Sequence, residues 1–344
     1  MSSTAARLAR ALTLAGVAAV SALAAGCSSS ASSATRATED SSSVVLNVGD
    51  QQQYLQTMLT ASGVLNGISY KVNFVEFDSG PLVDAGFAAH RIDVGFMGDL
   101  PASLAARSGL PVVAIAVDRP IGASEYLLAQ PSITTIAQLR GKPVAYTTGT
   151  SEQAFALRAL KTAGLTQADV HQVNVSLQQL GTVLQSGAAV ASVVSAEQKA
   201  DYQLAHPGAK VLATIQTVAP PSYGYTLATK AALADSAKLK AIDDLTKRLI
   251  LASNWQKSHQ AQWVTGYFVT VEHQTPAVAK LILAAGGTET YVPINAAVQG
   301  ALQQMVDIMA ASGGIPADFS VAPLYSTAEA ARYDAIVTAV PQNG

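Results

Sequence analysis

Small polar residues gather at four places where an apolar, strand-like segment is followed by a helix-like one. These places are Gly49-Asp50-Gln51, Asp78-Ser79-Gly80, Gly98-Asp99 and Thr148-Gly149-Thr150-Ser151. Each junction offers free backbone N–H groups and the positive end of a helix, which together can hold a compact oxyanion by hydrogen bonds alone. Because the last junction has no Lys, His or Cys beside it, it predicts binding rather than catalysis.

The same residues also fit ordinary helix caps. Thr150 and Gln153 have the spacing of a capping box, Gly80-Pro81 fits an N-cap followed by a proline, and Asp99 is a common N-cap residue. Helix caps occur in every α/β protein. The spacing alone therefore leaves both interpretations open at each junction.

Motifs typical of enzymes and nucleotide-binding proteins are absent from the sequence. It contains no G-x-x-x-x-G-K-[ST], G-x-G-x-x-G, H-E-x-x-H or G-x-S-x-G segment. Glu125, at the start of the strand-like segment EYLLA, could face a cleft or solvent. The histidines are scattered, and we expect surface roles for them: His90, His171, His206, His259 and His273. We therefore expect no enzyme activity, no cofactor and no metal site.

Apolar segments that could form buried strands alternate with helix-like segments of about ten residues. VVLNV, YKVNFVEF, IDVGF and VVAIAVD form a first series, and PVAYT, VHQVNVS and AVASVVS form a second. This alternation is typical of βαβ units and predicts an α/β class with mixed, mostly parallel sheets flanked by helices. From about Ala231 the chain becomes almost wholly helical, and we expect its aromatic residues to pack in the core: Trp255, Trp263, Tyr267 and Phe268.

The two series predict two lobes. We assign residues 44–130 to the first part of lobe 1, residues 131–221 to lobe 2, and residues 222–344 to the return into lobe 1 and the C-terminal helices. Pro131-Ser132 and Pro220-Pro221-Ser222 are the predicted crossings between the lobes. Ordinary surface loops are the alternative at both places.

The N-terminus has the pattern of an export signal. MSSTAARLAR is basic, ALTLAGVAAVSALAA is shorter than the ~20 residues of a membrane span, and Ala24-Ala25-Gly26-Cys27 resembles a bacterial lipobox. Ala24 departs from that motif, which more often carries Leu. We predict a lipoprotein signal peptide over residues 1–27, lipidation of Cys27 and a Ser-rich tether over residues 28–43. A cleaved signal without lipid and an uncleaved anchor are the alternatives.

Composition and charge fit a globular protein outside the cytoplasmic membrane. The 344 residues are 49% hydrophobic and 13% charged, enough to bury one large or two medium cores. The formal net charge of −2 becomes −4 without Arg7 and Arg10 of the first segment. Nothing in this balance favours nucleic acid or an anionic membrane face. We expect a monomer whose contact with the membrane is its lipid anchor.

Three long segments resemble the periplasmic substrate-binding proteins of ABC importers of the aliphatic sulfonate, taurine and nitrate group. They are LNVGDQQQ, VEFDSGPLVDAGFAAHRIDVGFMGDLPASLAARSGLPVVAIA and ITTIAQLRGKPVAYTTGTSEQAFALRALKTAGL, and the resemblance extends to about Thr229. It implies a two-lobe periplasmic-binding-protein type II fold with a two-strand hinge, which closes on a small anionic ligand and delivers it to ABC permease subunits.

The resemblance also implies cleft positions. They fall on Gln51, Ser79, Gly98, Asp99, Thr150 and Ser151, with Glu125 near the crossing. The oxyanion would lie between Gly80-Pro81 and Thr150-Ser151.

One family motif is missing. Where the family often has a Trp-Asp-Pro type motif, this chain reads SVVSAEQKADYQ, and Ser195 is the best positional match. The absent aspartate would pair with a ligand amine, which argues against taurine, and Glu197 could replace it only with a shifted register.

From these features we expect a lipid-anchored solute-binding protein for a small organic anion, and an organosulfonate above all. A binding protein for nitrate or for an aromatic or heterocyclic nutrient is the first alternative. A thiamine-precursor-synthase-like enzyme is the second, although that chemistry needs a centre rich in His and Cys and the single Cys here lies in the leader. A surface sensor without a transporter is the third.

Overall fold

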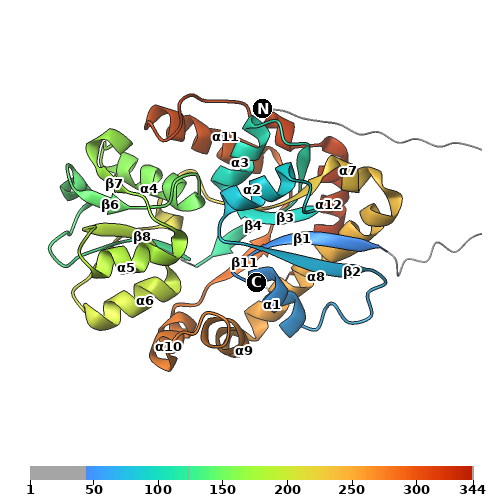
Figure 1. Cartoon of the computed structure of the whole chain (residues 1–344), viewed down its shortest axis with the longest axis horizontal. Coiled ribbons are helices and arrows are strands. Elements are labelled where there is room, and N and C mark those ends of the chain that lie inside the picture. Colours follow the sequence, from blue (N-terminus) through green and yellow to red (C-terminus); the bar gives the residue numbers. More distant parts are fainter. Residues whose placement is uncertain (1–43, 123, 343–344) are drawn as a thin grey trace, which may run out of the picture. The chain divides into compact units, whose positions relative to one another are not determined.

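Two mixed β-sheets organise the chain (Figure 1). The computed structural model describes residues 44–122 and 124–342. The first sheet has the order β11-β4-β10-β3-β1-β2. Its strands are β1 (Val45–Gln51), β2 (Lys71–Phe77), β3 (Val94–Gly98), β4 (Val112–Ile121), β10 (Gly224–Thr229) and β11 (Thr288–Tyr291). We call this sheet with its helices the first lobe.

The second lobe contains a sheet of order β7-β6-β8-β5-β9. Its strands are β5 (Glu125–Ala129), β6 (Pro143–Ala145), β7 (His171–Val173), β8 (Ala191–Ser195) and β9 (Lys210–Thr214). In each lobe most strands run in one direction: β10 and β11 are reversed in the first sheet, and β5 is reversed in the second. The predicted mixed, mostly parallel α/β class is therefore confirmed.

Helices cover both faces of each sheet. In the first lobe α2 and α3 pack on one face of the sheet, and α1, α8 and α12 pack on the other. α7 packs against α8, and α11 packs against α3. These helices are α1 (Tyr54–Ala61), α2 (Gly80–Ala88), α3 (Asp99–Arg107), α7 (Lys230–Ala234), α8 (Ser236–Ser258), α11 (Ala296–Ala311) and α12 (Thr327–Ala339). In the second lobe α4 (Ser151–Thr162) faces one side, and α5 (Leu180–Gln185) and α6 (Ala196–Ala205) face the other.

The segment after α8 connects the two lobes on one side. It contains α9 (Gln260–Val264), a π-helical turn at Thr265–Val269 and α10 (Pro276–Ala285). Apolar residues of α10 and α9 form a cluster with Ala200 of α6, so this segment packs against the second lobe. Short 3₁₀ turns lie at Ile136–Leu139, Gln167–Asp169, Leu177–Gln179, Ile215–Thr217 and Ala322–Leu324.

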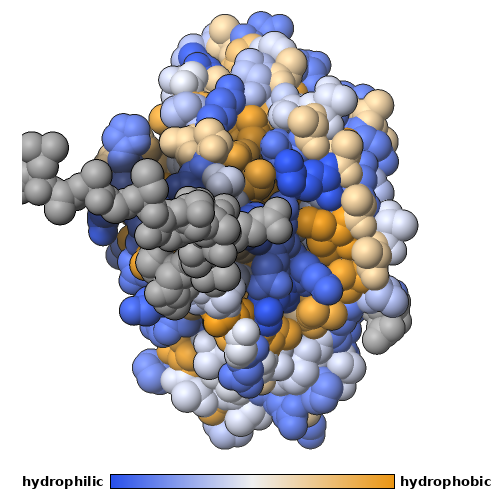
Figure 2. Space-filling model, turned by 90° about the vertical axis from the view of Figure 1, so that its right-hand side faces the viewer, coloured by the Kyte–Doolittle hydropathy of each residue, from blue (hydrophilic) through white to orange (hydrophobic). Residues whose placement is uncertain are grey.

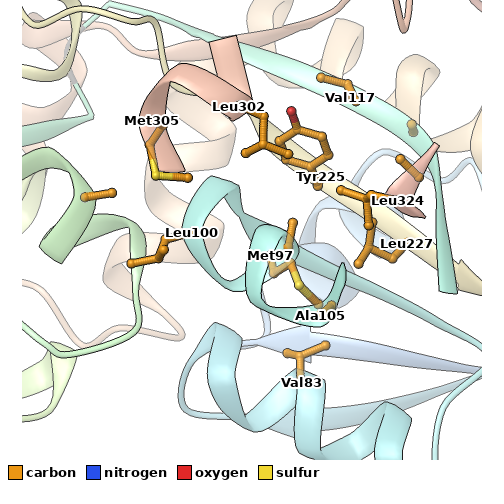
Figure 3. Close-up of a cluster of buried hydrophobic side chains, with 14 of the residues drawn as sticks. Val83, Met97, Leu100, Ala105, Val117, Tyr225, Leu227, Leu302, Met305 and Leu324 are labelled. Carbon is orange, nitrogen blue, oxygen red and sulfur yellow. The ribbon is translucent and has the colours of Figure 1, made fainter. Parts of the chain in front are cut away.

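The main core lies around β3, β4 and β10. Val112 to Val117 of β4 form an unbroken apolar run and are all buried, as expected for a strand covered on both faces. Figure 3 shows how residues from distant parts of the chain meet here: Val83 of α2, Leu100 of α3, Tyr225 of β10 and Met305 of α11. Full burial of one such aliphatic side chain contributes about 1.5–3 kcal/mol to stability. This packing holds α2 and α3 in place on the sheet.

The chain crosses between the sheets twice. The first crossing lies between Ile121 of β4 and Glu125 of β5, and the second lies between β9 and β10 and contains Pro220-Pro221-Ser222. The first crossing was expected at Pro131-Ser132, and this prediction is wrong, because β5 pairs with β8 and β9 of the second sheet. The residues of an apolar strand do not indicate which of two sheets the strand joins.

One visible face of the first lobe is mixed in character. Figure 2 shows hydrophobic side chains scattered among hydrophilic ones on the face at the right of Figure 1, an ordinary protein surface. Within residues 44–122 and 124–342, no helix is both long enough and apolar enough to cross a membrane. The predicted signal peptide, Cys27 and the tether of residues 28–43 lie outside the described residues.

Candidate ligand-binding cleft

Two adjoining cavities lie between the lobes. One, of about 300 Å³, is lined by the starts of α2, α3 and α4, and we call it the polar cavity. The other, of about 240 Å³, is lined by α9, the π turn and α10, and we call it the aromatic cavity. They share seven lining residues, so together they form one cleft: Gln52, Tyr54, Pro120, Ser124, Ser195, Tyr267 and Glu289.

The polar cavity brings together most of the residues that the sequence singled out. Seven of them line it: Gln51, Gly80, Gly98, Glu125, Thr150, Ser151 and Ser195. Ser79 and Asp99 do not. Ser79 is the N-cap of α2, and the Asp99 carboxylate lies 3.4 Å from Arg158 within the protein. Asp99 therefore forms an ion pair within the protein and is not available to a ligand in the cavity.

The helices that begin at the polar cavity lack side-chain caps. No side chain caps α2, α3 or α4, whereas Asp235, Thr275, Asn295 and Ser326 cap α8, α10, α11 and α12. The capping box that the spacing of Thr150 and Gln153 permits does not form, since the Thr150 hydroxyl donates to the Thr147 carbonyl and Gln153 accepts from the Gly149 N–H. The N–H groups of Leu100 and Glu152 already interact with carboxylates, whereas those of Gly80 and Ser151 are left for a ligand.

Glycine permits a close approach of the two lobes at this point. Ser151 of α4 lies so near Gly98 of β3 that a Cβ on Gly98 would overlap the serine hydroxyl. Pro81 of α2 would likewise lie 3.3 Å from a Cβ on Gly149. The starts of helices from both lobes therefore meet around one cavity.

A buried carboxylate shapes the loop after β1. Asp50 is fully buried and accepts hydrogen bonds from the N–H groups of Gln51, Leu55 and Gln56 at 2.8–2.9 Å. Gln52 and Gln53 adopt φ values of 56° and 58°, a region that costs non-glycine residues energy and is found at binding sites. Asp50 does not line the cleft itself. It holds the turn that presents Gln51 and Gln52.

Arg158 of α4 connects the lobes behind the cavity. Its side chain is fully buried and donates to the carbonyls of Ala154 and Pro220 and to the Ser222 hydroxyl, at 3.1, 2.8 and 2.5 Å. The Asp99 carboxylate is its counter-ion. The guanidinium thus joins α4 to α3 and to the second crossing.

Among Asp, Glu, Lys, Arg and His, only Asp and Glu line the cleft in the part of the chain that the structure describes. Six line it, without any Lys, Arg or His: Asp118, Glu125, Glu152, Glu197, Glu272 and Glu289. Burial is the main reason why the pKa of each is raised, to about 7 for Glu289 and well above its usual range for Asp118 and Glu125. Neighbouring carboxylates raise the pKa of Asp118 and Glu125 further. The cleft therefore has an acidic lining.

Aromatic rings enclose the other part of the cleft. The Tyr54 ring lies edge-on to Trp263 and Tyr267 at 5.3 and 5.5 Å, and the Trp263 and Tyr267 rings stack at 4.7 Å. Phe96 stacks on Tyr54 at 6.4 Å. Trp263 and Tyr267 belong to the core as expected, but they also line the aromatic cavity, which sequence reasoning missed.

Several lining residues had no role in the sequence analysis. Asp118 directly follows the apolar run of β4, a position that could have been noticed, and Tyr54 follows the Gln-rich loop. Glu289 gave no signal, because β11 lies within a stretch expected to be helical. Glu197 lines the aromatic cavity next to Ser195 and accepts a hydrogen bond from the Ser195 hydroxyl.

Known proteins share both sequence and fold with this chain. It matches the family described as NMT1/THI5 like over residues 67–257, more than half of its length. It is 31% identical over 153 residues to a protein of Escherichia coli strain K12 whose name provisionally describes it as an aliphatic sulfonates-binding protein. That alignment covers 43% of this chain and 48% of the other, so the chain spans about half of that curated relative.

Solved structures match over a longer range. The alkanesulfonate-binding protein SsuA of Xanthomonas axonopodis pv. citri, bound to MOPS, has a TM-score of 0.71 at 23% identity and covers 82% of this chain and 97% of its own. The periplasmic aliphatic sulphonate binding protein SsuA of Escherichia coli has a TM-score of 0.71 at 22% identity over 82% and 92%. The desulfurization enzyme DSZB scores 0.58 at 12% identity over 85% and 99%.

At these identities the structural matches show the fold, and they confirm the predicted binding-protein architecture. The sequence match extends from the loop before β2 into α8. It therefore includes both crossings and the start of every helix that opens onto the polar cavity except α1. The chain thus belongs to the NMT1/THI5-like family.

Proposed function

We propose that the protein is an extracytoplasmic, lipid-anchored solute-binding protein that captures a small organosulfonate and delivers it to an ABC importer. The main support is the interlobe cleft, at which uncapped helix starts from both lobes meet. Such starts favour negatively charged oxygens through N–H groups and the helix dipole. The names of the matched relatives, which refer to sulfonates, agree with this proposal.

The sulfonate group would lie in the polar cavity. The N–H of Gly80 and the N–H and hydroxyl of Ser151 are its proposed donors. The Ser195 hydroxyl also lines the cavity, but it donates to Glu197. Gln51 is a weaker candidate, because its side-chain amide donates to the Phe96 carbonyl at 2.8 Å. The lobes would open and close about the two crossings, as in hinge motions of other two-lobed binding proteins. No bond in the ligand would break.

The size of the cleft argues against nitrate. Cavities of about 300 and 240 Å³ are far larger than a planar inorganic anion, and the aromatic rings would have no function for such a ligand. DSZB shows that the fold also occurs in an enzyme. The single cysteine of this chain, Cys27, lies in the predicted leader, so we propose a carrier without catalytic activity.

The proposed partners follow from this role. The protein would act as a monomer, with Cys27 diacylated at the outer face of the cell membrane and ABC permease subunits as the receiving partners. The Ser-rich residues 28–43 would act as a flexible tether.

A ligand screen tests the proposal. Purified mature protein would be melted in the presence of alkanesulfonates, sulfate esters, nitrate and aromatic carboxylic acids. A ligand at ~100 times its Kd stabilises the protein by about 2.7 kcal/mol, which raises the melting temperature measurably. We expect a shift with one or more sulfonates and none with nitrate. A shift with carboxylic acids and no sulfonate would refute the proposed substrate class.

A further inference from the structure

The lining of the cleft does not suit a ligand whose only charge is negative. Six carboxyl groups line the two cavities, and no Lys, Arg or His does so within the described residues. Glu152 also stands at the start of α4, where its carboxyl interacts with Thr150 and with its own N–H. Part of the positive end of this helix is thus already neutralised. A second, cationic group on the ligand would offset this excess of acid.

Asp118 gives the position for such a group. Its side chain is 1% exposed, lines the polar cavity, and has an Oδ1 atom without a hydrogen-bond partner. A Cβ on Gly224 would overlap this carboxylate, so the neighbouring glycine makes room for it. A buried carboxyl that lacks a partner costs free energy. Its position in the cavity wall indicates that the partner comes with the ligand.

Glu289 and two tyrosines complete this position. Tyr54 donates a hydrogen bond to Glu289 at 3.3 Å, and charge on Glu289 raises the pKa of Asp118, so these groups are neighbours. Tyr54 and Tyr267 line both cavities, and their rings lie 5.5 Å apart. Aromatic rings attract organic ammonium groups through their π-faces.

Basic residues in the described part of the chain do not fill this position. Lys257 of α8 is close enough to Glu289 to affect its pKa, but the Lys257 ammonium is buried without a hydrogen-bond partner and does not line either cavity. Within the described residues, no three acidic, His or Cys side chains are placed to hold a metal ion. An organic cation, whose charge is spread over alkyl groups, fits rings and separated carboxylates better than a metal ion.

We propose that the ligand is zwitterionic: an ammonium group is held by Asp118, Glu289, Tyr54 and Tyr267, while the sulfonate lies at the starts of α2 and α4. This inference rests on the proposed function, since it adds a second charged group to the sulfonate ligand. It also explains why rings and carboxylates adjoin in one cleft. An ammonium beside Asp118 would favour the ionised carboxylate and so lower the pKa that burial raises.

Two ligands of equal shape test the inference. The probes are 3-(trimethylammonio)propane-1-sulfonate and 4,4-dimethylpentane-1-sulfonate, in which a carbon replaces the ammonium nitrogen. Calorimetric titration of the mature protein should give at least about tenfold tighter binding of the ammonium compound, a ratio that corresponds to ~1.4 kcal/mol. Propyltrimethylammonium, which has no sulfonate, is the third probe.

Two variants assign the effect to its residues. Asp118→Asn keeps the shape of the side chain and should weaken the ammonium compound about tenfold while leaving the carbon analogue unchanged. The matched control is Asp84→Asn, because Asp84 of α2 is also a carboxyl with a buried, unpartnered oxygen but lines neither cavity. The control should bind both sulfonates as the unmodified protein does. Circular dichroism would check that each variant is folded.

The outcomes separate the two proposals. Equal or tighter binding of the carbon analogue, or an equal loss for both sulfonates in Asp118→Asn, would overturn the zwitterionic ligand and leave the sulfonate proposal in place. Binding of propyltrimethylammonium without either sulfonate would support the ammonium position and refute the sulfonate class. No binding of any of the three probes would count against both.

Discussion

The buried contact between Arg158 and Asp99 gives a sharp prediction about stability. The Arg158 side chain is fully buried and the Asp99 side chain is 3% exposed. In Arg158→Met the apolar part of the side chain is kept, but Asp99 loses its counter-ion, and Pro220 and Ser222 lose a donor. Breaking a buried pair from one side typically costs 3–5 kcal/mol, so we expect the free energy of unfolding to fall by about 4 kcal/mol.

A double variant separates the charge from the packing. In Arg158→Met with Asp99→Asn the uncompensated carboxylate is gone, and we expect about 1–3 kcal/mol of the loss to be recovered, as for other directly interacting pairs. Asp169→Asn is the control, because Asp169 and Arg140 form an ion pair at the surface, where such pairs contribute about 0–1 kcal/mol.

Urea unfolding followed by tryptophan fluorescence measures these variants together with Asp99→Asn alone. Trp255 and Trp263 lie in the segment that packs near the cleft, so the signal reports on this region. A loss below about 1 kcal/mol in Arg158→Met, or a double variant as unstable as the sum of the single ones, would refute the assignment of Arg158 as a buried connection between the lobes.

Three further predictions follow from other residues. Ser151→Ala should weaken binding of the sulfonate by about 1.5 kcal/mol if its hydroxyl donates to a charged oxygen, while Ser79→Ala, outside both cavities, should not; equal affinities by calorimetry would move the oxyanion elsewhere. Burial raises the pKa of Asp84 to about 7, so the folded state prefers the protonated carboxyl, and this group should cost stability as pH rises from about 4 through 7. Asp84→Asn should remove this contribution, of order 4 kcal/mol, and parallel stability curves for the two proteins would contradict it. Cys27→Ser should release the protein from the membrane fraction into the medium, and unchanged fractionation on immunoblots would argue against lipidation.

The strand-to-helix junctions were predictable from sequence because their signals are local. An apolar run ending in small polar residues fixes where a strand stops and a helix starts, and parallel neighbours place such ends at one edge of a sheet. Gly80, Gly98, Thr150 and Ser151 therefore meet at the polar cavity as expected. Asp99 follows the same local rule, yet its carboxylate turns to Arg158, and no local signal distinguishes the two directions.

The acidic and aromatic part of the cleft was not predictable in this way. Glu289 and Tyr54 are 235 residues apart and form a hydrogen bond, and Trp263 and Tyr267 are spaced like ordinary core residues of a helix. Which of their faces borders a cavity depends on where α9, α10 and β11 fold back, and this is set by contacts with α6 and β4.

The sequence by itself determined the α/β class, the two lobes, the family resemblance and the junctions, because each depends on periodicity or on neighbouring residues. Only the tertiary structure decided which sheet β5 joins, which acidic side chains pair within the protein and which face the cleft. Those outcomes depend on long-range packing, which places residues together irrespective of their separation in the chain. The charge of the cleft, and hence the kind of ligand it suits, is therefore a property of the folded protein.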